Sequence, residues 1–105
     1  MKKQIWHKEN ARKIPKYLHY LHNSGQKCLV CGSNCIELHH VKTKHNRLKD
    51  DSHIIPLCPD HHRGPEFSAH DTPAAFRARY SDEHLLQVAA VLFAEYEKYD
   101  IICQK

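Results

Sequence analysis

Two short clusters of cysteine and histidine side chains have the spacing of metal-binding half-sites. Cys28 and Cys31 are separated by two residues, and Cys58 and His61 repeat that spacing further along the chain. Four such ligands, two from each short loop, complete the tetrahedral shell of a structural zinc ion. The sequence therefore predicts a zinc site. One alternative stays open, because Cys35 lies in the same loop as the first pair and is a rival ligand.

Three further histidines exceed what one zinc ion needs. His39 and His40 are adjacent between the half-sites, and His62 directly follows the second one. Imidazoles held close to a rigid zinc site could form a second, open metal site that acts on a substrate. Glu66 and His70 follow His62 at about one and two helical turns, so either could add a ligand if a helix continued that far.

A β-hairpin is expected to position the histidine pair. Residues 36–41 and 54–57 carry side chains that suit strands, and the two segments can pair. Successive side chains of a strand point to opposite faces, so His39 could bind metal while His40 faces a substrate water. The connection, residues 42–52, is polar and largely cationic, and is predicted to be a long loop.

Helices are predicted on both sides of this core. Apolar residues at helical spacing indicate an N-terminal helix within about 10–24. Pro59 favours a helix start after Cys58, but Gly64 and Pro65 should end that helix early. C-terminal helices are expected over about 72–102, and their apolar stripe is predicted to be core. The stripe consists of Leu85, Val88, Ala89, Leu92, Phe93, Tyr96 and Tyr99.

The length of 105 residues indicates a single domain over residues 1–105, and the predicted strands and helices make it α+β. The chain is 41% hydrophobic and 27% charged, which is ordinary for a soluble protein, and no apolar run approaches a membrane span. The N-terminus carries no pattern of a secretion signal. Five cysteines, four of them between Cys28 and Cys58, suit metal binding in a reducing compartment better than disulfides. We therefore expect a cytoplasmic location.

The charge is distributed unevenly along the chain. Residues 1–49 hold 11 Lys and Arg against 2 Asp and Glu, whereas residues 50–105 hold 5 against 10. Such asymmetry indicates a polyanionic partner on one face, although a solvated charged surface would explain it equally well. The cationic loop could neutralise DNA phosphates and would read little base sequence. Its basic residues are Lys42, Lys44, Arg47 and Lys49.

Residues 37–41 followed by 52–62 resemble the HNH, or ββα-metal, nuclease motif in its zinc-stabilised form. The resemblance covers about residues 28–70 and implies a small treble-clef-like ββα-metal core with a zinc knuckle. It implies that His39 and His62 bind a catalytic divalent metal and that His40 is the general base. His53 stands at the middle position, where the family usually has Asn, and would support the base.

The resemblance implies a metal-dependent DNA endonuclease that hydrolyses phosphodiester bonds to a 5′-phosphate and a 3′-hydroxyl. The ligands leave the catalytic metal open among Mg²⁺, Mn²⁺, Ni²⁺ and Zn²⁺. Residues 16–32 and 56–76 are also similar to small phage and prophage HNH proteins of the RecA-dependent recombination-enhancement type. That similarity implies a role in recombination in a bacterial host, with a recombinase filament as partner. The alternatives are a non-catalytic zinc-bound DNA-binding or adaptor module, and a protein-interaction module that uses the Tyr-rich last helix.

Overall fold

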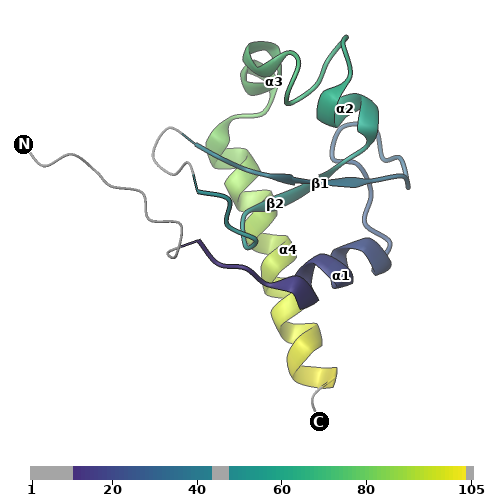
Figure 1. The fold of residues 1–105 in the computed structure, drawn as a ribbon, viewed down its shortest axis with the longest axis vertical. Helices are drawn as coiled ribbons and strands as arrows, with labels where there is room; N and C mark the ends of the chain where they lie inside the picture. The colour runs from purple at the N-terminus through teal and green to yellow at the C-terminus, as the bar shows by residue number, and fades with distance from the viewer. Residues whose placement is uncertain (1–10, 44–47, 104–105) are drawn as a thin grey trace, which may run out of the picture.

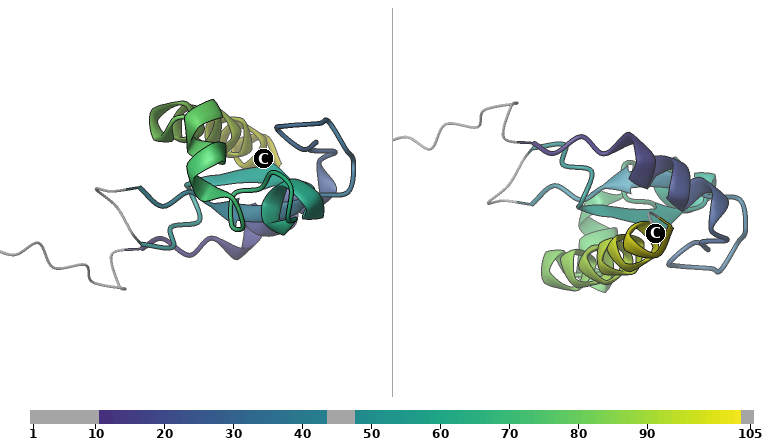
Figure 2. Two further views of the ribbon diagram at one scale, coloured as in Figure 1. Left: turned by 90° about the horizontal axis from the view of Figure 1, so that it is seen from above. Right: turned by 90° about the horizontal axis from the view of Figure 1, so that it is seen from below.

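The protein has a small α+β fold, seen in a computed structural model that describes residues 11–43 and 48–103. In chain order the elements are α1 (Pro15–Asn23), β1 (Glu37–His40), β2 (Ile54–Leu57), α2 (Pro59–Arg63), α3 (Pro73–Arg79) and α4 (Asp82–Cys103). The two strands form the centre, and the helices surround them (Figure 1). Seen from above or below, the sheet lies between α1 and α4 (Figure 2).

The predicted hairpin is confirmed. Strands β1 and β2 are antiparallel, with His39 opposite Ile55 and His40 opposite Ile54. Directly opposed side chains point to the same face, so His39 shares a face with Ile55 and His40 shares the other with Ile54. The adjacent histidines therefore start on opposite faces of the sheet. The predicted loop between the strands is only partly described, since residues 44–47 lie outside the described residues.

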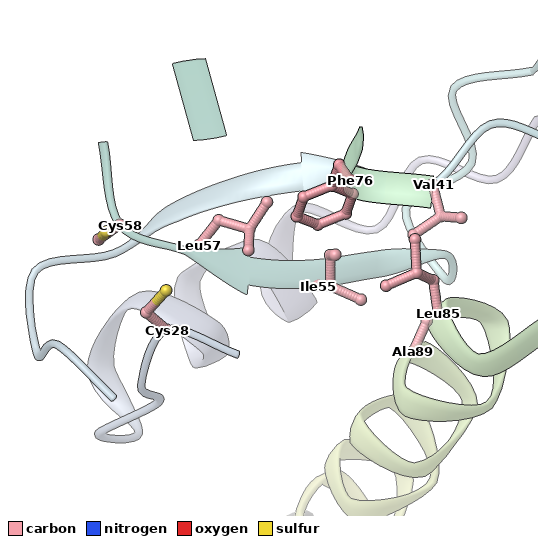
Figure 3. Close-up of a cluster of buried hydrophobic side chains, with 8 residues drawn as sticks. All are labelled: Cys28, Val41, Ile55, Leu57, Cys58, Phe76, Leu85 and Ala89. Carbon is pink, nitrogen blue, oxygen red and sulfur yellow. The ribbon is translucent and has the colours of Figure 1, made fainter. Parts of the chain in front are cut away.

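A small core forms on each face of the hairpin. Ile55 and Leu57 pack with Phe76 of α3 and Leu85 of α4 on one face (Figure 3). Ile54 packs against α1 and the lower part of α4 on the other face. Strand β2 is buried on both sides, which explains its continuous apolar sequence. Two cores of this size leave a small margin of stability, so a bound metal would add substantially to it.

Helix α1 begins later than the predicted range of about 10–24. Pro15 occupies its first turn, where a missing N–H costs nothing. The preceding residues, 11–14, are not helical. Their backbone is instead hydrogen-bonded to Asp51. Ile14 N–H donates to the Asp51 carboxylate, and Arg12 O accepts from the Asp51 N–H. Tertiary hydrogen bonds thus set the start of this helix.

Helix α2 is short, as Gly64 and Pro65 predict. It starts at Pro59 and ends at Arg63, and Gly64 N–H donates to Asp60 O at 2.8 Å. A Cβ at position 64 would collide with that carbonyl oxygen, so glycine is required at this close approach. The chain therefore turns away from α2 directly after Arg63.

Helix α4 is the longest element and confirms most of the predicted stripe. Ser81 Oγ accepts from His84 N–H at 3.1 Å and caps its start. Leu85, Ala89 and Tyr96 are buried. The prediction was wrong for Tyr99, which is 51% exposed, because the C-terminal end of α4 extends beyond the sheet (Figure 1). Within the described ranges, none of the helices combines the length and apolar character needed to cross a bilayer.

Candidate functional site

The four predicted zinc ligands converge. The ligand atoms of Cys28, Cys31, Cys58 and His61 all lie within 4.8 Å of one another. Cys58 Sγ lies 3.2 Å from His61 Nδ1, and the Cys31 and Cys58 sulfurs are 3.8 Å apart. Sulfurs about 2.3 Å from one zinc ion in tetrahedral geometry would be about 3.8 Å apart. The four residues can therefore hold a metal ion, and the donor set suits structural zinc.

Local backbone geometry explains why the first half-site closes. Gly32 has a φ of 76°, and its N–H donates to Cys28 O at 2.9 Å. Val30 N–H points to Cys28 Sγ at 3.4 Å. Although burial opposes ionisation, hydrogen bonds from the backbone amides of Cys58, Cys31 and Val30, together with the His61 ring, lower the pKa of Cys28 to about 6. The turn thus favours the thiolate, which is the form that binds zinc.

Cys35 does not join this cluster. It is exposed, its backbone N–H donates to Ser33 Oγ, and its sulfur is not among the convergent ligand atoms. The alternative ligand left open by the sequence is therefore disfavoured. Cys35 provides a natural control for experiments on the cysteines.

Three imidazoles form a second convergent cluster beside the first. One ring nitrogen each of His39, His62 and His70 lies within 4.8 Å of the others. His62 Nε2 and His70 Nε2 are 3.1 Å apart, and the ring centroids of His39 lie 5.1 Å from both other rings. The predicted approach of His39 to His62 is thus present, and His70 completes a group that can hold a metal ion.

His70 reaches this cluster by a route that helical spacing did not predict. Helix α2 ends at Arg63, so His70 does not lie two turns along it. The chain instead loops out and returns, and His70 N–H donates to His62 O at 3.1 Å. Glu66, the other predicted candidate, is exposed and is not part of the cluster.

Glu37 holds the His62 ring in place. Its Oε1 lies 2.8 Å from His62 Nδ1, and its Oε2 accepts from Arg63 Nη2 at 2.6 Å. The Arg63 and His62 contacts lower the pKa of Glu37 to about 2. A carboxylate on Nδ1 leaves Nε2 available to a metal. Glu37 was not predicted: it lies two residues before His39 on the same strand face, but no sequence pattern pairs it with His62.

His39 is suited to metal binding at neutral pH. Burial, followed by the neighbouring His62 and His70, lowers the pKa of His39 to about 3. The ring is therefore neutral and offers a lone pair.

His40 has a different partner from the one the sequence suggested. Its Nε2 lies 2.8 Å from Asp51 Oδ1, and the Asp51 side chain is only 9% exposed. Asp51 was expected only as part of the polar loop, and its contact with His40 was not predicted. His53, predicted to support the base, accepts from Val41 N–H through its carbonyl at 2.7 Å. Its buried Nδ1 has no hydrogen-bond partner among the described residues.

The histidines line a hollow of about 450 Å³ on the surface. His39, His40, His62 and His70 all contribute to its wall. Three cationic side chains also line it, namely Lys42, Lys49 and Arg77. Arg77 comes from α3 and was not predicted. Lys44 and Arg47, the other predicted DNA contacts, lie outside the described residues.

Comparison with protein-family models, with curated proteins and with solved structures finds no match to this chain. Any function must therefore be argued from the residues themselves. The hollow combines a three-imidazole cluster, a carboxylate-bonded histidine and three cationic side chains, one of which, Arg77, lies 3.8 Å from the carboxylate of Asp82. These groups suit the binding of a metal ion and of an anionic ligand.

Proposed function

We propose that this protein is a metal-dependent HNH endonuclease that hydrolyses phosphodiester bonds in DNA. The observation that carries the proposal is the convergence of His39, His62 and His70 in the same hollow as His40. A two-stranded hairpin followed at once by a short helix supports a ββα-metal core, since these elements supply His39, His40 and His62. The adjacent cysteine-rich cluster supports the zinc-stabilised form of that core.

His40 is proposed to act as the general base. It lines the hollow beside the three-imidazole cluster, and an imidazole is the side chain best suited to take a proton from water near neutral pH. The water oxygen then forms a bond to phosphorus, the bond from phosphorus to the 3′ oxygen breaks, and the leaving 3′ oxygen takes a proton from solvent water. The products are a 5′-phosphate and a 3′-hydroxyl.

The three-imidazole cluster is proposed to hold the catalytic metal. His39, His62 and His70 fit this role because each offers one ring nitrogen to the convergent group. A divalent cation bound there would supply positive charge that stabilises the phosphate and the leaving oxygen. Nitrogen donors suit Mn²⁺, Ni²⁺ and Zn²⁺ better than Mg²⁺.

The resemblance to phage and prophage recombination-enhancement nucleases also suggests a biological role. It assigns the protein a role in DNA recombination or processing in a bacterial cytoplasm, with a recombinase filament as partner. Binding to RecA-coated and bare single-stranded DNA tests this part. Equal affinity for the two would count against the filament.

Cleavage of supercoiled plasmid tests the activity itself. The zinc-loaded wild type should nick plasmid with at least one of Mg²⁺, Mn²⁺, Ni²⁺ or added Zn²⁺. His40→Ala should lower the rate by about 100-fold or more, because a general base contributes about 10²–10⁴-fold. His22→Ala, which changes an exposed histidine of α1, is the control and should retain full activity.

Two results of this test would contradict the proposal. Equal nicking by the wild type and His40→Ala would remove His40 from the role of base. Binding of DNA without cleavage in any metal would favour a non-catalytic zinc-bound module. Zinc content, measured in both variants, should stay the same.

Replacing Glu37 with glutamine should weaken metal binding at the three-imidazole cluster by about 10–100-fold, as expected for loss of a carboxylate that orients a histidine ligand. The physical reason is its 2.8 Å contact with His62 Nδ1. Calorimetric titration of the zinc-loaded protein with Mn²⁺ measures the change. Glu97→Gln, which alters an exposed carboxylate of α4, should bind Mn²⁺ as the wild type does. An unchanged affinity in Glu37→Gln would remove Glu37 from this role.

Replacing Lys49 with alanine should reduce the salt dependence of DNA binding. Lys49 is exposed and lines the hollow, where it can neutralise one phosphate. The slope of log K against log salt should fall by about 1, with little change in sequence preference. Fluorescence anisotropy over a salt series measures it. Lys98→Ala on α4 should leave the slope unchanged, and the same slope in Lys49→Ala would place the DNA elsewhere.

A further inference from the structure

We propose that Asp51 is the residue that positions His40, fixing both the direction and the tautomer of its ring. This inference rests on the proposed function, because it concerns the same general base. It assigns the supporting role to a carboxylate in the loop between the strands rather than to the His53 side chain. Asp51 acts through His40, so it is a positioning residue.

The contact between the two side chains is short and largely shielded from water. Asp51 Oδ1 lies 2.8 Å from His40 Nε2, and the side chains are 9% and 15% exposed. A hydrogen bond to a carboxylate is stronger in such surroundings than one exposed to solvent. His40 is the last residue of β1, so the strand fixes the position of its backbone but not the orientation of its ring. The carboxylate supplies the second point of attachment.

The Asp51 carboxylate is itself fixed by the chain before α1. Its Oδ2 accepts from Ile14 N–H at 2.7 Å. Its own backbone N–H donates to Arg12 O at 2.8 Å. Among the described residues each carboxylate oxygen therefore has a defined partner, and the carboxylate plane cannot turn without breaking a hydrogen bond. Residues 12–14 therefore help to orient the His40 ring through their hydrogen bonds to Asp51.

The neighbouring carboxylate, Asp50, has different hydrogen-bond partners. Asp50 Oδ1 accepts from Ser52 Oγ at 2.6 Å and from Ser52 N–H at 2.8 Å. Those bonds stabilise the turn before β2. Asp50 thus offers a matched control with the same charge, one residue away, and bonds to Ser52 in place of the His40 ring.

The tautomer of His40 follows from the acceptor. A carboxylate can only accept, so neutral His40 must carry its proton on Nε2 and leave the lone pair on Nδ1. Nδ1 is then the atom that takes the proton from water. In Asp51→Asn, the amide oxygen can still accept from Ile14 N–H, and the amide nitrogen then donates toward His40 Nε2. That contact would move the ring proton to Nδ1 and block the base.

The test compares Asp51→Asn, Asp50→Asn and His40→Ala with the zinc-loaded wild type, all at one neutral pH. Steady-state cleavage of a fluorescent DNA duplex gives kcat and KM, and ¹⁵N NMR of the histidine rings gives the tautomer of His40. Asp51→Asn should lower kcat by about 100-fold or more, leave KM within about twofold, and place the His40 proton on Nδ1. Asp50→Asn should keep the wild-type tautomer, and any loss of melting temperature should be similar in the two variants.

Wild-type kcat in Asp51→Asn, with His40→Ala inactive, would overturn the inference. So would an unchanged His40 tautomer in Asp51→Asn. If the wild type cleaves no DNA, the proposed function fails. The NMR comparison still shows whether Asp51 sets the tautomer of His40, because it reports the position of the ring proton and needs no turnover.

Discussion

Replacing Cys58 with serine is expected to unfold most of the protein at room temperature. Cys58 belongs both to the four zinc ligands and to the core cluster of Figure 3, and it is only 6% exposed. Structural zinc contributes about 10–16 kcal/mol of apparent free energy in small domains, whereas a whole folded domain is stable by about 5–15 kcal/mol. Losing one thiolate ligand therefore removes a contribution comparable with the total. Circular dichroism melts, with zinc counted by mass spectrometry, measure the effect.

Cys35→Ser is the matched control for this prediction. The exposed Cys35 lies in the same loop but outside the cluster. The control should keep one zinc ion and melt within about 4 °C of the wild type, because surface substitutions change stability by about 0.5 kcal/mol or less. If Cys58→Ser kept both the zinc and the wild-type melt, the cluster would not be a structural metal site.

Replacing His39 with alanine is expected to abolish cleavage while the fold and the structural zinc remain. His39 is the member of the three-imidazole cluster that comes from β1, and its ring lies 5.1 Å from both other rings. A bound cation contributes several kcal/mol to phosphoryl chemistry, and about 1.4 kcal/mol corresponds to a tenfold rate. The expected loss is therefore about 1,000-fold or more. Plasmid nicking measures the rate, and Mn²⁺ calorimetry measures metal binding at the cluster.

His19→Ala controls for the loss of a histidine as such. His19 is exposed on α1, so this variant should nick DNA and bind Mn²⁺ like the wild type. Both variants should contain one zinc ion, which separates the two metal sites. Wild-type cleavage by His39→Ala would place the chemistry outside the three-imidazole cluster.

The zinc cluster and the hairpin could be predicted from sequence because their signals are local. Two ligands separated by two residues sit on one tight turn, so Cys28 and Cys31 must lie close together in any fold. The end of α2 was also predictable, since Gly64 and Pro65 oppose a helix wherever they occur. The resemblance to the HNH motif further identified His39 and His62 as partners.

The groups that orient the histidines could not be predicted in this way. Glu37 contacts His62 across 25 positions of sequence, and Asp51 contacts His40 across 11. Such contacts depend on the strand register and on the path of the loop, which no local pattern encodes. Arg77 likewise reaches the hollow only because α3 folds over it.

The sequence by itself determined which residues can bind metal, that a hairpin forms with helices on both sides of it, and which histidines are in excess. Only the tertiary structure decided which carboxylate holds each imidazole, and that His70 joins the cluster through a returning loop in place of a continued helix. The physical reason is one of range. Ligand type and backbone preference act over a few residues, whereas the direction of a ring is set by hydrogen bonds to partners that the whole fold brings near.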